Sequence, residues 1–231
     1  MLLELDGTRL LTDPILRSRV AHLRTLHPPP GRDKLGRIDA VLLSHAHRDH
    51  LDVRSLRRLG KGVAIVAGRG AARSLRRRGY RAPVDVVEEG DERAIGQVTV
   101  QATPARHGRP GSAVGFLVRG GKTVYFAGDT DLFPGLAGLA DPLDVALVPI
   151  WGWGPSLGEG HLDPERAAEA VSLLEPRIVI PIHWGTLHPL GMSRRAFLRE
   201  PPEAFRRLVA ERSPEVEVRV LAPGGETWID G

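Results

Sequence analysis

The feature that most constrains this chain is a histidine-rich run that directly follows a short apolar segment. Residues 40–43 are Ala-Val-Leu-Leu, which predicts a buried strand. Three histidines and an aspartate then fall within six consecutive positions, as His45, His47, Asp49 and His50. Imidazole and carboxylate are ligands of Zn²⁺ and similar divalent ions, and on a turn just past a strand end they can converge on one point. The run therefore predicts a metal site; the alternative is a polar loop that is rich in histidine.

Three further candidate ligands lie just after other predicted strands. Taken singly, a histidine at a strand end is more often structural, and an aspartate after glycine is more often part of a turn. Together with the first run they make seven ligands, the number that two metal ions would need with one bridging carboxylate. The three are His107, after the strand predicted at 98–102; Asp129, after the strand at 123–127; and His183, after the strand at 177–182.

Many short strands, with helices in both halves of the chain, predict two sheets that are covered by helices. Residues 17–37, with three prolines in the middle, are expected to form an irregular loop. Strands are expected at 1–5, 9–12, 40–43, 63–66, 84–87, 94–102, 114–118, 123–127, 144–149, 177–182, 216–221 and 226–229, and helices at about 53–59, at 70–78, from Asp163 to Pro176, and from Pro201.

Composition limits the class of protein and the type of metal ligand. A hydrophobic content of 42% is enough for a sizeable core, so we expect one folded domain over residues 1–231. Cysteine is absent, which excludes disulfides and thiolate ligands and leaves histidine and carboxylate to hold any metal. No apolar run approaches the roughly 20 residues needed to span a bilayer, and no signal peptide is visible. The cytoplasm is the expected location.

The net charge of +4 is carried almost entirely by arginine, in two clusters. A nucleic-acid or anionic-membrane surface is one interpretation of such clusters. We favour the other, a pair of solvated helix faces, because neither cluster is interleaved with the aromatic residues that stack on bases. Nucleic acid is therefore disfavoured as a partner. The clusters are Arg54, Arg57 and Arg58, and Arg73, Arg76, Arg77, Arg78 and Arg81.

The run from His45 to His50, followed in order by His107, Asp129 and His183, resembles the metallo-β-lactamase superfamily. Within it, four segments resemble the branch that contains N-acyl-phosphatidylethanolamine phospholipase D and the ascorbate-phosphate lactonases. These segments are Leu11–Pro14, Gly128–Thr130, His161–Glu165 and Pro181–Thr186. That branch usually begins with a Gly-His-Ala-Thr segment, whereas this chain opens at Met1. Either the start is shorter or the true start lies upstream, and we expect one edge of the first sheet and one pocket wall to be incomplete.

The resemblance implies a four-layer αββα sandwich of mixed α and β structure with a dinuclear metal site. One metal would be held by His45, His47 and His107, and the other by Asp49, His50 and His183, with Asp129 bridging the two. His161 matches a branch residue near the metals, to which we assign a role toward the substrate or leaving group. The alternative for His161 is a residue before a helix with no catalytic part.

The expected function is hydrolysis by a dinuclear metal-dependent enzyme. Two divalent cations that share a water lower its pKa, which gives a bridging hydroxide at neutral pH. Zn²⁺ is favoured, while Mn²⁺ and Fe are compatible with the ligands. The residues expected to act in catalysis are Asp49, Asp129 and His161. The leading substrate is a phosphodiester, small or lipid-like. The alternatives are a lactonase or another hydrolase of the metallo-β-lactamase fold, a nuclease, or a non-catalytic binding module. A homo-oligomer is compatible with the sequence.

Several neighbours of the candidate ligands are expected to support them. Thr130, Asp131 and Asp52 are candidates to accept hydrogen bonds from metal-bound histidines, although Asp52 is equally suited to cap a helix. A tryptophan-rich segment is expected to form a pocket wall, the alternative being that its tryptophans are core or interface residues. Two arginines beside the ligands could meet an anionic substrate, the alternative being that they point away from the site. These are Trp151 and Trp153 within 149–154, Trp184, and Arg48 and Arg106.

Overall fold

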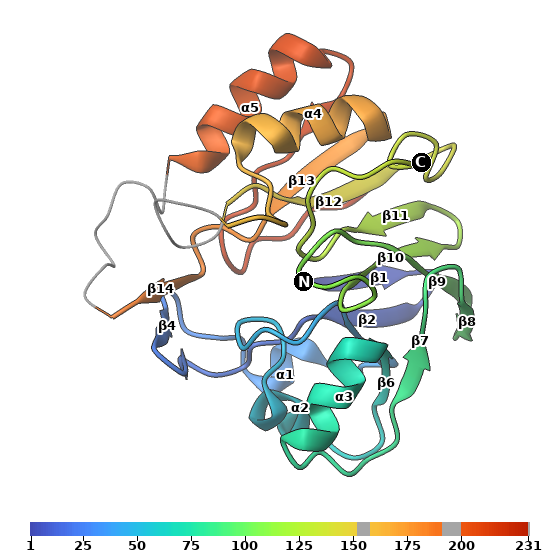
Figure 1. Cartoon of the computed structure of the whole chain (residues 1–231), viewed down its shortest axis with the longest axis vertical. Helices are drawn as coiled ribbons and strands as arrows, with labels where there is room; N and C mark the ends of the chain where they lie inside the picture. Colours follow the sequence, from blue (N-terminus) through green and yellow to red (C-terminus); the bar gives the residue numbers. More distant parts are fainter. Residues whose placement is uncertain (152–157, 191–199, 231) are drawn as a thin grey trace.

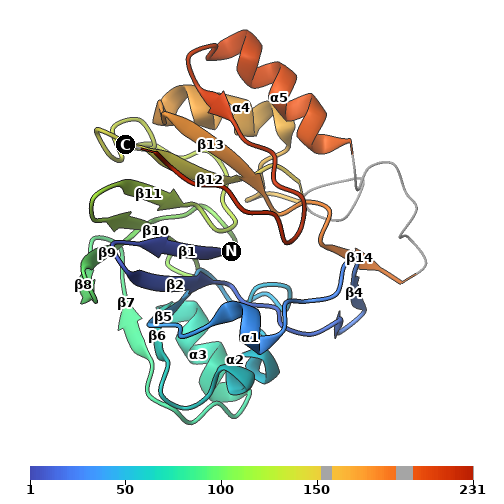
Figure 2. The same ribbon diagram turned by 180° about the vertical axis from the view of Figure 1, so that it is seen from behind.

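Two β-sheets face each other in the computed structural model, and helices cover the outer face of each (Figures 1 and 2). The structure describes residues 1–151, 158–190 and 200–230. The helices α2 and α3 lie on one outer face, and α4 and α5 on the other. The arrangement is the expected four-layer αββα sandwich. The helices are α1 (Arg32–Leu35), α2 (Val53–Leu59), α3 (Arg69–Arg77), α4 (Pro164–Leu174) and α5 (Pro201–Arg212).

The first sheet has five strands in the order β1-β2-β5-β6-β7. The antiparallel hairpin of β1 and β2 is followed by parallel pairing from β2 to β7. In β5 all four residues are buried, as the apolar run predicted. The strands are β1 (Leu2–Leu5), β2 (Thr8–Thr12), β5 (Ala40–Leu43), β6 (Ala64–Gly68) and β7 (Asp85–Val87).

The second sheet has seven strands in the order β15-β13-β12-β11-β10-β9-β8. The strands β11, β12, β13 and β15 are parallel, and β9 runs in the same direction because both β9 and β11 are antiparallel to β10. The strands are β8 (Glu92–Ile95), β9 (Val98–Pro104), β10 (Val114–Arg119), β11 (Thr123–Phe126), β12 (Val145–Pro149), β13 (Ile178–Ile182) and β15 (Glu217–Val218).

Three apolar clusters hold the layers together. One lies between the two sheets and includes Leu42 and Phe116. A second packs α4 and α5 on the seven-stranded sheet, with Phe205 fully buried. The third packs the helices α2 and α3 on the five-stranded sheet, around Leu56 and Leu75. Because β5, β9, β11 and β13 all end at the same side of this sandwich, the turns that follow them are brought together.

Three segments differ from the expectation. The strand expected at 94–102 is two strands, β8 and β9, which turn at Gly96 with a φ of +57°. The apolar alternation continues across this turn because Ile95 pairs with Val98. The segment 17–37 is not an irregular loop throughout. It contains α1 and the strands β3 (Arg19–Val20) and β4 (Leu23–Thr25), which form a small sheet with β14 (Leu187–Pro189).

The end of the chain has less strand than expected. Only Glu217–Val218 of the segment 216–221 pairs with β13, and residues 226–229 form no strand. This last segment is held instead by Arg219, whose guanidinium donates to the Thr227 hydroxyl and the Trp228 carbonyl. Within the described ranges, no helix has the length and apolar content that a bilayer crossing requires.

The arginine clusters are not simply solvated helix faces. Arg57 donates to the Gly79 carbonyl, Arg58 donates to the Leu16 carbonyl, and Arg78 donates to two carbonyls of the histidine-rich turn. These three side chains therefore connect segments of the first half of the chain. The side chains of Arg54, Arg73, Arg76, Arg77 and Arg81 have no hydrogen bond or ion pair among the described residues.

Candidate metal centre

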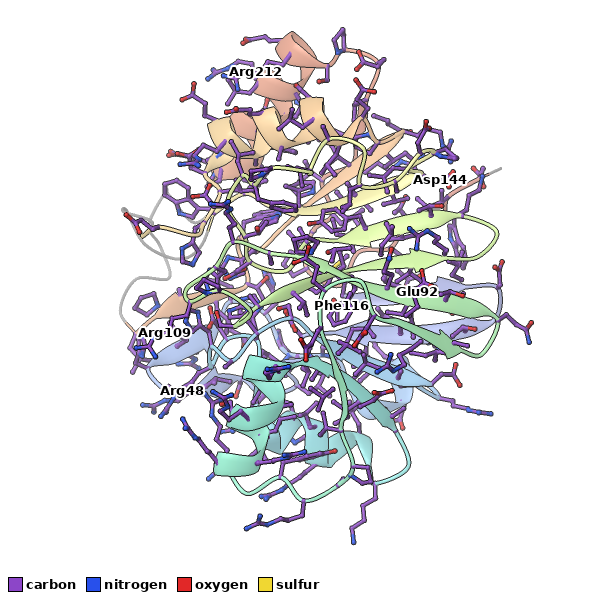
Figure 3. The ribbon with its side chains drawn as sticks, turned by 45° about the vertical axis from the view of Figure 1, so that its right-hand side comes forward. Arg48, Glu92, Arg109, Phe116, Asp144 and Arg212 are labelled. Carbon is purple, nitrogen blue, oxygen red and sulfur yellow. The ribbon has the colours of Figure 1, made fainter. Side chains whose placement is uncertain are left out.

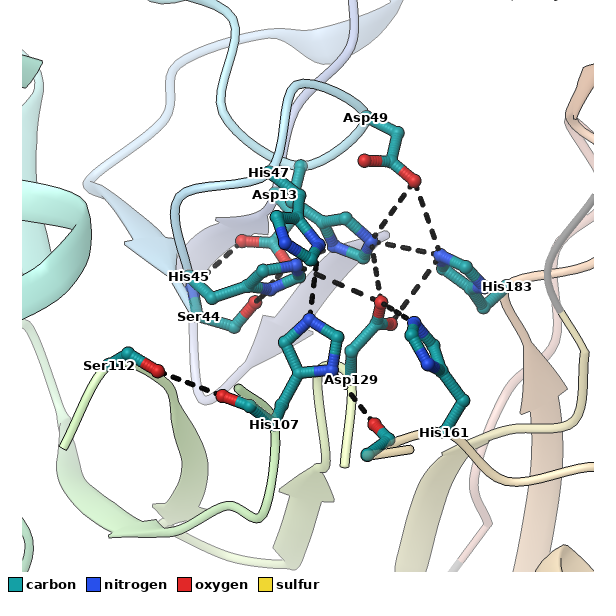
Figure 4. Close-up of polar contacts among 12 residues, drawn as sticks. Asp13, Ser44, His45, His47, Asp49, His107, Ser112, Asp129, His161 and His183 are labelled. Carbon is teal, nitrogen blue, oxygen red and sulfur yellow. Dashed lines mark hydrogen bonds and ion pairs between the residues drawn. The ribbon is translucent and has the colours of Figure 1, made fainter. Parts of the chain in front are cut away.

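Side chains from five separate turns converge at the side of the sandwich where the parallel strands end (Figure 4). All seven expected ligands lie there. Their ligand atoms form groups whose members lie within 4.8 Å of one another. The groups are His45, His47, His107 and Asp129; Asp49, His50 and His183; and Asp13, His45 and His50.

The first group places three imidazoles beside one carboxylate. Nε2 of His107 lies 3.1 Å from Nδ1 of His47, and Nε2 of His45 lies 3.7 Å from Oδ2 of Asp129. The rings of His45 and His107 have their centres 4.5 Å apart. His45, His107 and Asp129 are buried, whereas His47 is exposed, so this group has one side open to solvent.

The second group, Asp49, His50 and His183, also contacts the Asp129 carboxylate. Nε2 of His50 lies 2.9 Å from Nε2 of His183, and both nitrogens lie within 3.8 Å of Oδ2 of Asp49. Asp129 contacts this group too, with Oδ2 3.3 Å from His50 and Oδ1 3.4 Å from His183. The Asp129 carboxylate therefore contacts histidines of both groups.

The outer contacts of four histidines fix which ring nitrogen carries the hydrogen. Nδ1 of His107 lies 2.8 Å from the Gly160 carbonyl, and Nδ1 of His183 lies 2.5 Å from the Trp151 carbonyl. A carbonyl can only accept, so both Nδ1 atoms donate, and in the neutral imidazole each Nε2 keeps a lone pair for a metal. Nδ1 of His50 donates in the same way to Asp13, at 2.8 Å.

Ser44 completes this pattern for His45. Its hydroxyl donates to Oδ2 of Asp13 at 2.5 Å, so it accepts from Nδ1 of His45 at 3.0 Å. The Nε2 atom of His45 thus also carries a lone pair. Four histidines present bare nitrogens to one region, and each has its ring orientation set by a partner behind it.

These donors fit a bound cation. The bare Nε2 atoms of His50 and His183 face each other at 2.9 Å, where two lone pairs repel unless a proton or a metal ion lies with them. Nε2 of His45 and Oδ1 of Asp129 are buried and have no hydrogen-bond partner in the described part of the chain. Buried acceptors without donors are rare and costly, and divalent cations bound here would satisfy these atoms.

The electrostatics agree with the donor geometry. Burial by itself would raise the pKa of the Asp129 carboxyl, but the charges of His183 and His50 outweigh burial and hold its pKa well below the ordinary value. Burial lowers the pKa of His45 well below the ordinary value. For His50, burial is outweighed by Asp129 and Asp13, so the pKa is well above the ordinary value. The region of His50 and Asp129 thus favours positive charge, which a second proton on His50 supplies in the metal-free chain and a bound cation would supply in its place.

His161 lies beside these groups and is not a member of any of them. Its Nδ1 donates to the Gly158 carbonyl at 3.1 Å, and its Nε2 lies 3.7 Å from Oδ2 of Asp129. Its ring centre is 4.6 Å from that of His107. Because its side chain is 24% exposed, its Nε2 is placed where a substrate could reach it.

The outer supports differ from those expected. Asp52 caps α2 by accepting from the amide and hydroxyl of Ser55, and it also pairs with Arg17. Thr130 accepts from the Arg106 amide, and Asp131 pairs with Arg166. None of the three contacts a candidate ligand histidine in the described part of the chain, so the capping role holds for Asp52, and Thr130 and Asp131 organise their own loops.

Asp13 is the supporting residue that sequence reasoning missed. It follows β2, with a φ of +40°, and its two carboxylate oxygens accept from the Ser44 amide, the Ser44 hydroxyl and His50. The signal was present as an aspartate directly after a buried strand of the first sheet. His107 and Asp129 were predicted as ligands because each follows a strand in the same way.

The expected pocket wall is only partly described. Trp153 lies outside the described residues. Trp151 and Trp184 both pack against the cluster around α4, and the Trp184 indole donates to the Pro181 carbonyl at 3.0 Å. Arg48 and Arg106 are not buried, and their side chains have no hydrogen bond or ion pair within the described ranges.

Replacing Asp13 with alanine is expected to weaken metal binding by about 10- to 100-fold, the usual effect of losing the partner behind a ligand histidine. The reason is that His50 would lose the carboxylate that orients its Nδ1–H. The measurement is competition for Zn²⁺ with a chelating dye. Asp39→Ala is the control, because Asp39 accepts from the Arg9 amide before the start of β5. Equal affinities for the two variants would contradict the role of Asp13.

Known proteins resemble this chain in sequence and in fold. Residues 8–184 match the family model described as the beta-lactamase superfamily domain. A protein of Caldivirga maquilingensis, described as a UPF0173 metal-dependent hydrolase, is 31% identical over 226 residues, which cover 96% of this chain and 90% of that protein. A Mycobacterium tuberculosis protein is 35% identical over 253 residues, and the match spans 96% of this chain but 64% of that longer protein.

A solved structure agrees over almost the full length. It is that of Igni18, described as a novel metallo hydrolase from the hyperthermophilic archaeon Ignicoccus hospitalis, with a TM-score of 0.72 and 26% sequence identity. The match covers 98% of this chain and 92% of that one.

Proposed function

Because this chain belongs to the beta-lactamase superfamily, we propose that it is a metal-dependent hydrolase whose active site is the convergence of histidines and aspartates at the strand ends. The observation that carries the proposal is the convergence of the histidine Nε2 atoms on the buried Asp129 carboxylate. Related proteins described as metal-dependent or metallo hydrolases support it. The folded unit is proposed to be a single domain over residues 1–231.

Two divalent cations are proposed, with Zn²⁺ favoured by the ligand types and Mn²⁺ or Fe compatible. When bound, such ions supply Lewis acidity, which lowers the pKa of a water and stabilises negative charge that develops on the substrate. The proposed ligands are His45, His47 and His107 for one ion, Asp49, His50 and His183 for the other, and Asp129 for both.

The side chains of this chain would hold and orient the reactants. Asp49 and Asp129 are kept ionised, because the neighbouring histidines lower both pKa values in spite of burial. Each carboxylate can therefore accept a hydrogen bond from an attacking water and orient its lone pair. His161 is held at Nδ1 by Gly158, which leaves Nε2, when protonated, to donate to the oxygen of a leaving group.

The proposed substrate is a phosphodiester, small or lipid-like. Supporting this choice, the side chains of Arg48 and Arg106 lie beside candidate ligands in the sequence and have no partners in the described part of the chain, so they are free to meet a phosphate. A lactonase is the second candidate, because the segments Leu11–Pro14 and Gly128–Thr130 resemble a branch that contains both activities.

The deciding experiment compares two chemistries on the same metal-loaded protein. Hydrolysis of bis(p-nitrophenyl) phosphate in preference to a panel of lactones is the expected result. The reverse preference would assign the chain to the lactonases. If neither class is hydrolysed, and the protein holds less than one metal per chain after reconstitution, the hydrolase proposal is wrong and a binding module is the better interpretation. Cleavage of single-stranded RNA, with binding that weakens as salt rises, would indicate a nuclease.

His161→Ala is expected to lower kcat by about 10²- to 10⁴-fold, the usual range for a general acid, while the metal content stays the same. The reason is that His161 faces Asp129 from the open side without belonging to a metal-binding group. The measurements are steady-state kinetics and metal analysis of the purified variant. Loss of metal in this variant would show that His161 is a ligand.

A further inference from the structure

A single guanidinium contacts both ends of the histidine-rich turn. Arg78 donates from Nη2 to the Ala46 carbonyl and from Nη1 to the Leu51 carbonyl, each at 2.8 Å. Ala46 lies between His45 and His47, and Leu51 directly follows His50. One side chain that is distant in sequence therefore holds the ligand turn, residues 45–50, by a hydrogen bond near each of its ends.

The backbone that carries Arg78 is itself fixed. Arg78 directly follows the last residue of α3, and Gly79 comes next with a φ of +76°. The Gly79 amide donates to the Arg76 carbonyl and the Tyr80 amide to the Leu75 carbonyl, which is the Schellman motif. Leu75 and Tyr80 are both buried in the cluster beneath the helices of the first sheet. The Arg78 guanidinium thus extends from a rigid support.

The turn has few other backbone hydrogen bonds. The amides of His50 and Leu51 both donate to the His47 carbonyl, at 3.2 and 2.8 Å. Arg78 is the one donor to the Ala46 and Leu51 carbonyls among the described residues. Without it, both carbonyls would lose their partner, and the backbone on each side of the ligands could rotate.

Arg78 makes these bonds from an exposed position, with the bond to Leu51 partly buried and the bond to Ala46 exposed. Because the donor is charged, each bond is stronger than one from a neutral donor. Arginine also supplies two parallel donors in one plane, which lysine does not.

We infer that Arg78 is a positioning residue, which holds the ligand turn in the conformation that binds metal. The inference rests on the proposed metal site. It gives a role to one arginine of a cluster that composition alone would assign to a solvated surface. Arg78 donates to two backbone carbonyls of the turn, so its expected effect is on metal affinity and on the order of the turn.

The test measures Zn²⁺ affinity by chelator competition in the full-length protein and in three variants. Arg78→Met is expected to bind Zn²⁺ about tenfold more weakly. Arg78→Lys should lie between Arg78→Met and wild type, because an ammonium lacks the planar fork that spans both carbonyls. Arg212→Met is the matched control: its guanidinium donates to the Glu165 carbonyl on the α4 and α5 layer, far from Arg48 and the ligand turn (Figure 3).

A second readout is hydrogen exchange of the His50 and Leu51 amides in the metal-free protein. The exchange rate is expected to rise in Arg78→Met and to stay unchanged in Arg212→Met. Similar melting temperatures of the two variants would show that the faster exchange is local to the turn. Equal Zn²⁺ affinity in wild type and Arg78→Met, or equal weakening in Arg212→Met, would overturn the inference and leave the proposed function intact. If wild type binds none of Zn²⁺, Mn²⁺ and Fe²⁺, both the inference and the proposed function are wrong. If Arg78→Met does not fold, the Zn²⁺ affinity of Arg78→Lys is the test instead. An affinity equal to that of wild type in Arg78→Lys would then refute the inference.

Discussion

Asp129→Ala is expected to reduce kcat/KM by roughly 10³-fold or more and to lower the metal content. Its carboxylate contacts both ligand groups, at 3.7 Å from His45 in the first and 3.4 Å from His183 in the second. Its removal takes a shared ligand from both proposed ions and leaves His50 and His183 without the charge that raises their pKa values. Metal analysis and steady-state kinetics on the same preparation measure both effects.

The control for this variant is Asp131→Asn. Asp131 is two residues further along the same loop, but its carboxylate pairs with Arg166 and accepts from the Leu132 amide. It is expected to keep the metal content and most of the activity. An Asp129→Ala protein that retains two metals per chain and full turnover would show that the ligand assignment is wrong.

Gly128→Ala is expected to destabilise the protein by about 2–5 kcal/mol and to weaken metal binding. Gly128 has a φ of +61°, and a Cβ there would lie 2.6 Å from the Cβ of Ser44. The backbone conformation disfavours any other residue, and the collision would displace the Ser44 hydroxyl that orients His45. For a chain of this size the fall in Tm is roughly 4–20 °C, measured by calorimetry without and with Zn²⁺.

Gly135→Ala separates the cost of the backbone conformation from the cost of the collision with Ser44. Gly135 also has a positive φ, at +89°, but a Cβ added there would meet no atom within 4 Å among the described residues. It should show only the cost of the backbone conformation, about 1–2 kcal/mol, with unchanged metal affinity. If Gly128→Ala is no more destabilising than Gly135→Ala, the close approach of Gly128 to Ser44 does not constrain the site.

Much of the fold was predictable because apolar periodicity and turn residues are local signals. The buried run of β5, the cap at Asp163 and the hairpin of β10 and β11 each depend on a few consecutive residues. The division of 94–102 into two strands was missed because the apolar alternation continues across the turn at Gly96. β4 was missed because its pairing with β14 joins residues that are more than 150 positions apart.

In the candidate site, too, local sequence signals predicted some residues and contacts between distant segments were missed. The seven ligands could be proposed from the sequence because each follows a segment with a strong strand pattern, and because histidine near aspartate suggests metal chemistry. The supports behind them could not, since two are backbone carbonyls, of Gly160 and Trp151, and any residue has a carbonyl. Asp52, Thr130 and Asp131 lie close in sequence to the ligands and could accept hydrogen bonds from histidines. Each instead contacts a residue that is not a ligand: Ser55, the Arg106 amide and Arg166.

The two ligand groups draw on both sheets of the sandwich. Asp13 and the turn 45–50 follow strands of the five-stranded sheet, whereas His107, Asp129 and His183 follow strands of the seven-stranded sheet. An ion held between them would act as a non-covalent cross-link across the interface of the two sheets. At a hundredfold excess over its dissociation constant, one such ion adds about 2.7 kcal/mol to the free energy of unfolding. Chelation would remove this cross-link, so metal supply would set the thermodynamic stability of the folded chain as well as its chemistry.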